Sequence, residues 1–262
     1  MDLQLKGRTA IVLASTKGLG RATAFSLATE GANVVISGRD EAALQTVADE
    51  LLRETDRKPL AVAADVTKSA EIAQLVEKTV EKFGTVDILI TNAGGPPAGA
   101  FDQMTDEHWQ QAFELNLLSV IRSIRAVLPV MRKQQFGRIV NFASSSFKQP
   151  LDNLILSNTF RTGIVGLAKT LATELGPDGI LINTVGPGRI GTERVAYIDS
   201  VCAEKIGQSA EEVRKQIEAT IPLGRYGDPD EFARVITFLA SPANSYVTGQ
   251  SILVDGGLVK AI

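Results

Sequence analysis

The chain has 262 residues, 44% hydrophobic and 22% charged, so it can bury a large core without disulfides or structural metals. Its formal net charge of −3 excludes an overall basic field that would recruit nucleic acid or anionic lipid. One Cys and one His exclude an internal disulfide and clustered Cys/His metal sites, so we expect no metal. Any chemistry must then depend on hydroxyl, amide or charged groups, or on a cofactor.

Short apolar runs alternate with longer helical patterns along the whole chain. In the first part we expect strands at Thr9–Leu13, Asn33–Ser37, Leu60–Ala63 and Val86–Ile90, with helices at Arg21–Glu30, Glu41–Glu54 and Ser69–Phe83. In the second part we expect strands at Arg138–Phe142, Ile180–Val185 and Ser251–Val254, with helices at Thr105–Gln134, Leu154–Leu175 and Asp230–Leu239. Pro129 predicts a bend or break in the long helix of the second part.

This alternation predicts a single α/β domain over residues 1–262, a doubly wound Rossmann-type fold whose parallel seven-stranded sheet has helices on both faces. The one long insertion, Arg189–Pro222, is expected to be a substrate lid. The first residues, Met1–Lys6, contain no apolar signal-peptide core, and no apolar run reaches the length of a membrane span. We therefore expect a cytoplasmic protein with no membrane partner.

A turn rich in small residues joins the first strand to the first helix. It consists of Ala14, Ser15, Thr16, Lys17, Gly18, Leu19 and Gly20. Small residues let the backbone approach a pyrophosphate, and the helix N-terminus offers free N–H groups to the anion. Ala14 stands where such motifs have their first Gly. The alternative interpretation is a tight turn that binds nothing.

The end of the second strand indicates which dinucleotide such a turn would bind. NAD-binding sheets place a carboxylate there to hold the ribose 2′-hydroxyl, but Arg39 stands ahead of Asp40. Together Lys17 and Arg39 favour a 2′-phosphate, and hence NADP(H) over NAD(H). Arg39 could instead be a solvated cation at the start of a helix.

Further motifs follow in a recognisable order. They are Asp65-Val66 after the third strand, Thr91-Asn92-Ala93-Gly94 after the fourth, Asn116 in the long helix, Asn141-Phe142-Ala143-Ser144, Asn183-Thr184-Val185-Gly186-Pro187-Gly188, Ile190 and Thr192. With these motifs the chain resembles the short-chain dehydrogenase/reductase family over essentially its full length, and most of all its β-ketoacyl-ACP reductase-like members.

The resemblance implies roles for these residues. Asp65 and Val66 would contact the adenine, and Ile190 and Thr192 would hold the nicotinamide carboxamide. Asn92, Ala93, Gly94, Pro187 and Gly188 would complete the cofactor site. Ser144 would orient the substrate oxygen, and Asn116 would hold a water and the local helix geometry. Apart from the resemblance, the loop Gly94–Gly99 follows the C-terminal end of a strand, where such sheets bind ligands, so it would form a wall of the substrate pocket, or else a plain turn. The resemblance also implies a homotetramer.

The sequence departs from the family where the family keeps its catalytic Tyr and Lys. The Tyr normally follows the Ser by thirteen residues and the Lys follows four later, but Ser157 and Arg161 occupy these positions. A serine hydroxyl is a far poorer acid than a phenol, and Arg stays charged. Arg161 can still stabilise an oxyanion. Ser157 and Arg161 share one helix face, and the alternative is that both are vestigial packing or surface residues.

Three mechanisms remain open. Ser144 and Arg161 polarise a carbonyl while water or substrate supplies the proton, or Tyr197 from the insertion replaces the missing acid, or no hydride chemistry occurs. The expected function is thus an NADP(H)-dependent oxidoreductase acting on a carbonyl/alcohol pair of a small molecule, similar to 3-oxoacyl reductases. The alternatives are an NADP(H)-binding sensor or scaffold without redox turnover, and lyase or isomerase chemistry on the same scaffold.

Overall fold

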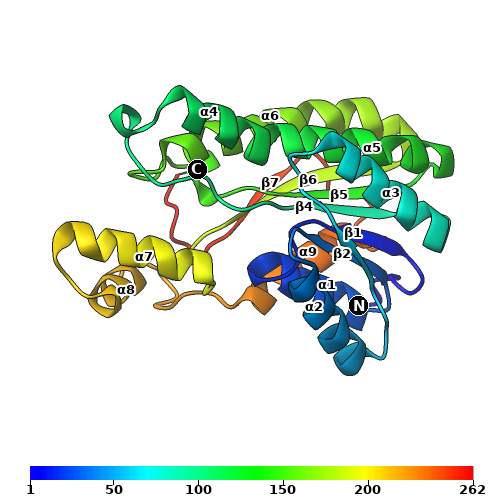
Figure 1. Cartoon of the computed structure of the whole chain (residues 1–262), viewed down its shortest axis with the longest axis horizontal. Coiled ribbons are helices and arrows are strands. Elements are labelled where there is room, and N and C mark those ends of the chain that lie inside the picture. Colours follow the sequence, from blue (N-terminus) through cyan, green and yellow to red (C-terminus); the bar gives the residue numbers. More distant parts are fainter. Residues whose placement is uncertain (262) are drawn as a thin grey trace.

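Seven parallel strands form the centre of the molecule in the computed structural model, which describes residues 1–261 (Figure 1). They are β1 (Thr9–Val12), β2 (Asn33–Gly38), β3 (Leu60–Ala63), β4 (Ile88–Thr91), β5 (Gly137–Phe142), β6 (Ile180–Pro187) and β7 (Ser251–Val254). Their order in the sheet is β3-β2-β1-β4-β5-β6-β7. The predicted doubly wound, seven-stranded parallel sheet is therefore confirmed.

Helices cover both faces of this sheet (Figure 1). One layer contains α1 (Gly18–Thr29), α2 (Glu41–Thr55) and α9 (Pro229–Ala240), and the other contains α3 (Ser69–Phe83), α5 (Ser119–Gln134) and α6 (Ile155–Leu175). Each layer has its own buried core, one around Leu27 and Phe232 and one around Leu75, Ile124 and Ile164. Strand residues are apolar on both sides because both sides are covered.

The long helix is interrupted, but not where Pro129 predicted. It consists of α4 (Asp106–Phe113), a wide π-helical turn (Glu114–Leu118) and α5, and α5 runs through Pro129 as one helix. The expected break at Pro129 is therefore wrong. The irregularity lies around Asn116 instead, and such π-turns are frequent at functional sites.

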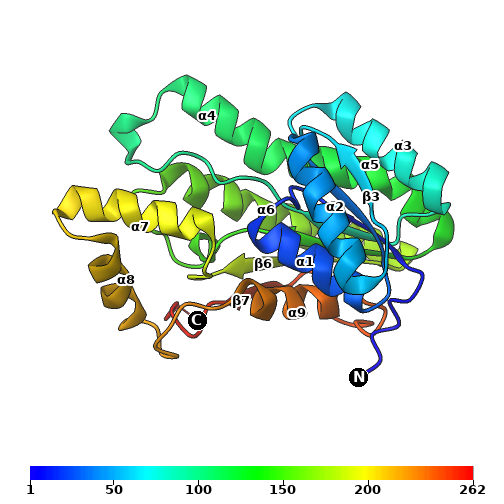
Figure 2. The ribbon, with the colours of Figure 1, turned by 60° about the horizontal axis from the view of Figure 1, so that its bottom comes forward.

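The insertion between β6 and α9 folds into two helices, α7 (Glu193–Ile206) and α8 (Ala210–Glu218). Both project to one side of the two helical layers, beyond the carboxyl ends of the strands (Figure 2). Thr192 and Ser209 cap their N-termini through side-chain oxygens. No helix in residues 1–261 is long and apolar enough to cross a membrane.

Candidate functional site

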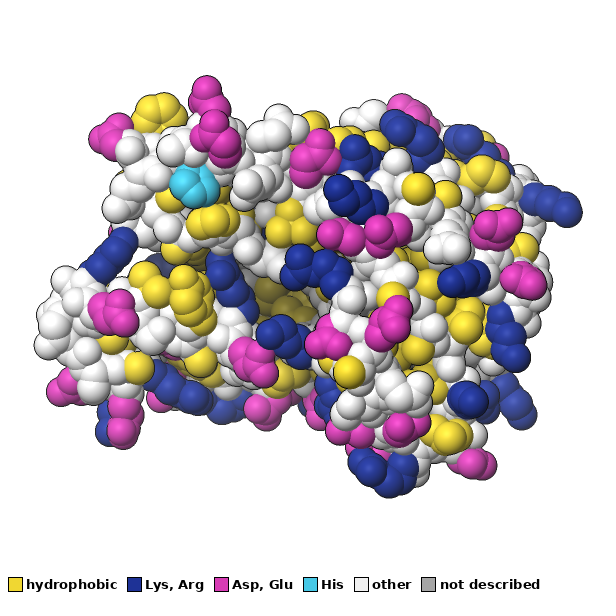
Figure 3. All heavy atoms as spheres, viewed as in Figure 1, with side chains coloured by type: hydrophobic (Ala, Val, Ile, Leu, Met, Phe, Trp, Pro, Cys, Tyr) yellow, Lys and Arg dark blue, Asp and Glu magenta, His cyan; other side chains and the backbone are white. Residues whose placement is uncertain are grey.

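A cavity of about 1340 Å³ opens at the carboxyl ends of the strands, where the strand order reverses between β1 and β4. Doubly wound sheets bind ligands at such a point. Figure 3 shows the hollow, with hydrophobic side chains in it and Lys and Arg side chains at its rim. Seven Lys or Arg residues line the cavity against three Asp or Glu residues, although the whole chain is acidic. The site therefore suits an anionic ligand.

Most of the predicted site residues line this cavity. They are Ala14, Thr16, Lys17, Gly18, Leu19, Arg39, Asp65, Val66, Asn92, Ala93, Gly94, Ser144, Ser157, Arg161, Pro187, Gly188, Ile190 and Thr192. Ser15, Gly20 and Asn116 do not line the cavity. They hold the turn and the loop that form its wall.

Gly20 and Ser15 fix the turn after β1. A Cβ atom on Gly20 would lie 2.5 Å from the carbonyl oxygen of Ala14 and 2.8 Å from Nδ2 of Asn92, so no larger residue fits. The hydroxyl of Ser15 donates to the carbonyl of Val12 (2.9 Å) and accepts from the N–H of Ser37 (2.9 Å). These contacts hold the turn against β1 and β2.

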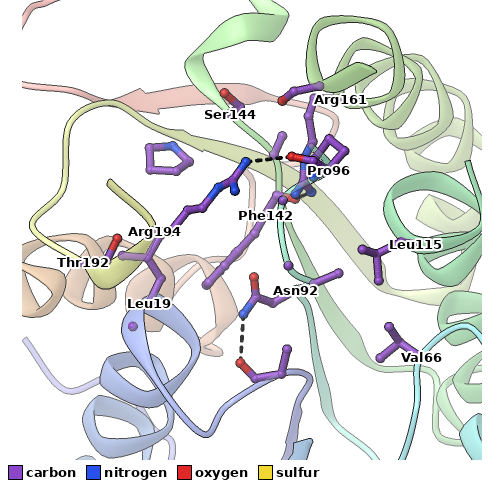
Figure 4. A pocket seen from close by; sticks show the side chains of 18 of the residues that line it. Leu19, Val66, Asn92, Pro96, Leu115, Phe142, Ser144, Arg161, Thr192 and Arg194 are labelled. Carbon is purple, nitrogen blue, oxygen red and sulfur yellow. Dashed lines mark hydrogen bonds between the residues drawn. The ribbon is translucent and has the colours of Figure 1, made fainter. Parts of the chain in front are cut away.

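Ala14 explains why motifs of this kind have Gly at this position. Its φ of 47° lies in the left-handed region, which costs an L-residue about 1 kcal/mol. The carbonyl of Ala14 accepts a hydrogen bond from Nδ2 of Asn92 (3.1 Å), which helps to hold the residue in this conformation (Figure 4). The replacement of Gly by Ala thus keeps the shape of the turn.

The N-terminus of α1 can hold a phosphate. Its N-cap, Lys17, provides no capping side chain, so the first N–H groups of the helix have no side-chain acceptor within the described residues. Nζ of Lys17 pairs instead with Oε2 of Glu193 at 2.8 Å, and both side chains are exposed. Such an exposed pair is worth less than about 1 kcal/mol, so a phosphate can displace it.

Arg39 and Asp65 lie near each other at the far side of the turn. Burial acts to raise the pKa of Asp65, but hydrogen bonds from the N–H and hydroxyl of Thr67, together with the charges of Arg39 and Lys68, lower it below its ordinary value. Asp65 is therefore ionised at neutral pH. This arrangement leaves Arg39 at the rim of the cavity, where it can meet a further phosphate.

Asn116 holds the wall of the cavity rather than its interior. Its side chain is fully buried, and Nδ2 donates to the carbonyl of Gly94 at 2.8 Å. This bond ties the π-helical turn to the loop that follows β4. The loop after β6 is fixed similarly, because the N–H of Gly188 donates to the carbonyl of Val254 at 2.9 Å.

Two serines, Ser144 and Ser157, line the cavity. Oγ of Ser144 accepts from the N–H of Ser146 at 3.2 Å, which leaves its own proton free to donate. Ser157 is 7% exposed, and its hydroxyl makes no hydrogen bond with any residue of the described chain. Both hydroxyls are therefore available to a ligand.

Arg161 lies on the same face of α6 as Ser157 and is only 7% exposed. Burial, and then the charge of Arg194, lowers the pKa of Arg161 to about 10. Within residues 1–261 its guanidinium makes one hydrogen bond, from Nη1 to the carbonyl of Phe142 (2.9 Å), and no ion pair. Arg161 is therefore not a surface residue but a buried charge that lines the cavity.

A comparison with Arg138 shows how unusual it is for a buried arginine to make a single hydrogen bond. Arg138 is equally buried, and burial lowers its pKa to about 10 as well. It nevertheless donates to the carbonyls of Asn244, Gly137 and Gly179, and stacks over the ring of Phe136. Arg138 is thus satisfied by the protein, whereas most N–H donors of Arg161 remain available to a ligand.

Arg194 is a site residue that the sequence analysis missed. It lies in the first turn of α7, and Nη2 donates to the carbonyl of Pro96 at 2.7 Å (Figure 4). Gly95 makes room for it, because a Cβ there would lie 2.9 Å from Nε of Arg194. Burial lowers the pKa of Arg194. A lone Arg in an insertion carries no sequence signal.

Tyr197 is the one tyrosine among the described cavity-lining residues. It is 54% exposed, and the guanidinium of Arg194 lies 5.6 Å from the centre of its ring. Tyr226 is buried and its hydroxyl donates to Oδ2 of Asp199, while Tyr246 is exposed elsewhere. A phenol acting in the cavity would therefore have to be that of Tyr197.

Comparison with known proteins defines the class. A family model described as enoyl-(acyl carrier protein) reductase matches residues 13–259. The 3-oxoacyl-[acyl-carrier-protein] reductase of Thermotoga maritima is 35% identical, over 98% of this chain and 100% of its own length. The chain belongs to the short-chain dehydrogenase/reductase family, and it is similar to the β-ketoacyl-ACP reductases within it.

Solved structures agree with this assignment. The L-sorbose reductase of Gluconobacter frateurii, complexed with NADPH and L-sorbose, superimposes with a TM-score of 0.94 at 31% identity and with full coverage of both chains. An actinorhodin polyketide ketoreductase with NADPH gives a TM-score of 0.92 at 36% identity, covering 96% of this chain and 97% of that one.

Proposed function

We propose that this protein is an NADP(H)-dependent oxidoreductase that interconverts a carbonyl and an alcohol on a small molecule, with an atypical catalytic site. The observation that carries the proposal is the grouping of Ser144, Ser157 and Arg161 in a cavity that begins at a phosphate-binding turn. The similar reductases whose solved structures contain NADPH support the cofactor.

The cavity fits NADP(H) along its length. The free N–H groups of α1 would hold the pyrophosphate, and Lys17 and Arg39 the 2′-phosphate. Asp65 and Val66 would line the adenine site, with Ile190 and Thr192 at the carboxamide. When bound, the cofactor supplies or accepts the hydride.

The chain's own residues would act on the substrate oxygen. The hydroxyl of Ser144 donates to the carbonyl oxygen and orients it. The guanidinium of Arg161 stabilises the negative charge that develops on this oxygen, which is worth most in a buried site. Ser157 stands in the position of the family's acid and holds the oxygen or a water that supplies the proton. Asn116 keeps the loop after β4 in place.

A second candidate function follows from the missing proton donor. The described cavity offers the half-exposed phenol of Tyr197 and no other tyrosine. A site without an efficient proton donor could bind NADP(H) as a sensor without redox turnover. The insertion 189–222 would be a lid in both cases, because α7 lines the cavity.

Titration of the purified protein with NADPH and NADH, followed by a screen of ketones for cofactor oxidation, separates these functions. The proposal expects tighter binding of NADPH than of NADH, and oxidation of NADPH with at least one ketone. Tight NADPH binding without turnover across a broad panel would favour the sensor. Absence of nucleotide binding would refute both.

A further inference from the structure

Two positive charges in the cavity lack an acidic partner. Three of the other cavity cations are ion-paired: Lys17 with Glu193, Arg122 with Glu114, and Arg189 with Asp199. Arg39 and Lys68 both act on the charge of Asp65. Within residues 1–261, Arg161 and Arg194 alone among the cations lining the cavity have no carboxylate beside them.

These two arginines repel each other across the cavity. The charge of Arg194 contributes to the lowered pKa of Arg161, so the groups are close enough to interact. Each is also partly or fully removed from water, which disfavours the charged form further. Such an arrangement costs the free protein stability, and negative charge between the two groups would remove that cost.

Arg194 points away from the phosphate-binding turn. Figure 4 shows it starting near Thr192 and Leu19 and extending away from them to Pro96, toward the side of the cavity where Ser144 and Arg161 lie. The groups that fit the cofactor phosphates lie at the other end, around the N-terminus of α1. The guanidinium of Arg194 therefore faces the substrate rather than the pyrophosphate.

Apolar residues from α7 and from the segment before α6 line the cavity together with Arg194. Ile198 follows it by one turn of α7 and lines the cavity. Leu154 also lines the cavity and pairs with Gly99 at the end of the loop that carries Pro96. A substrate here would have a hydrocarbon part beside these residues, and its negative group would be the one that Arg194 binds with its planar fork.

We infer that the substrate is an oxo acid, a carbonyl compound with a carboxylate close to the carbonyl, and that Arg194 binds the carboxylate while Arg161 faces the carbonyl oxygen. This inference rests on the proposed function and narrows its substrate class. In the reduction, the carbonyl carbon gains a hydride from NADPH, which becomes NADP⁺. The carbon–oxygen π bond breaks, and the oxygen gains a proton from water.

The test compares short α-keto and β-keto acids with their methyl esters, using the full chain and NADPH. The acid is expected to have a kcat/KM about 10- to 100-fold higher than its ester. Arg194→Gln should remove this preference by raising KM for the acid far more than KM for the ester, with no change in the Kd of NADPH. Arg194→Lys should restore part of it. Arg53→Gln, an exposed arginine of α2 outside the cavity, is the matched control and should change nothing.

A binding measurement keeps the test independent of turnover. Malonate is titrated by calorimetry into the protein loaded with NADP⁺, and Arg194→Gln is expected to weaken binding about 10-fold or more. Three results with the wild-type protein would overturn the inference. They are equal kcat/KM values for acid and ester, no binding of malonate, and tighter binding of inorganic phosphate than of malonate. Loss of NADPH affinity in Arg194→Gln would overturn it too, because Arg194 would then belong to the cofactor site. Failure of NADPH to bind the wild-type protein would refute the proposed function itself.

Discussion

Replacing Arg161 with Met should make the free protein more stable while removing its activity. Burial and the charge of Arg194 lower the pKa of Arg161 to about 10, and this fall corresponds to roughly 3 kcal/mol of unfavourable free energy for the charged form. Removing the hydrogen bond to the carbonyl of Phe142 costs about 1 to 2 kcal/mol. The net gain in the free energy of unfolding is therefore about 1 to 2 kcal/mol.

The lowered pKa of Arg161 also determines how the stability gained by Arg161→Met depends on pH. Arg161 is protonated in both the folded and the unfolded chain below about pH 9, so the full penalty is present there. It decreases only above about pH 10, where the folded protein can release the proton. The stability difference between wild type and Arg161→Met should thus be constant between about pH 6 and 9.

Arg138→Met is the matched control. Arg138 has the same exposure and a similarly lowered pKa, but it satisfies three backbone carbonyls and stacks on Phe136. Removing it gives the same relief of roughly 3 kcal/mol, but it removes three hydrogen bonds to backbone carbonyls, at about 1 to 3 kcal/mol each, and the stacking on Phe136 as well. Arg138→Met should therefore lower stability.

Thermal unfolding of the ligand-free proteins measures both variants. Arg161→Met should raise Tm by about 2 to 6 °C, and Arg138→Met should lower it. If Arg161→Met lowers Tm as Arg138→Met does, Arg161 is a structural residue whose charge the protein already satisfies. The assignment of Arg161 to the catalytic site would then be wrong.

Other substitutions test the cofactor end and the missing acid. Arg39→Asp should weaken NADPH about 10- to 100-fold in a binding titration and leave NADH nearly unchanged; equal loss of both would contradict the 2′-phosphate assignment. Gly20→Ala places a Cβ 2.5 Å from the carbonyl oxygen of Ala14, so urea unfolding should show a loss of about 1 to 3 kcal/mol, and an unchanged midpoint would contradict that packing. Ser157→Tyr combined with Arg161→Lys should introduce a pH-dependent ketone reduction, because a phenol and an ammonium titrate where Ser and Arg do not; a flat pH profile would show that position 157 does not reach the substrate oxygen.

The strands and most helices could be predicted because their signals are local. Apolar runs mark strands buried on both faces, and their alternation with helices predicts a parallel, doubly wound sheet. The order of the strands comes from the structure. The interruption of the long helix could not be predicted. Pro129 is the local helix breaker, whereas the π-turn around Asn116 depends on a bond to Gly94, which the sequence places 22 residues away.

The part of the candidate site that has a local sequence pattern could be predicted. A turn that lets a phosphate approach the backbone needs small residues at fixed spacing, and Arg39 stands where NAD-binding sheets have a carboxylate. Arg194 was missed because its role depends on where α7 carries it, across the cavity to Pro96. The lack of partners for Arg161 is likewise a property of the folded protein, and its sequence neighbours do not reveal it.

The central claim is that this site transfers a hydride between NADP(H) and a carbonyl compound. It is tested most directly with NADPH that carries deuterium on the hydride-donating carbon of the nicotinamide. After incubation with the protein and the keto-acid panel, mass spectrometry of the products should find deuterium on the carbinol carbon of a hydroxy acid. Bound NADPH that loses no deuterium to any member of the keto-acid and ketone panels would contradict the claim.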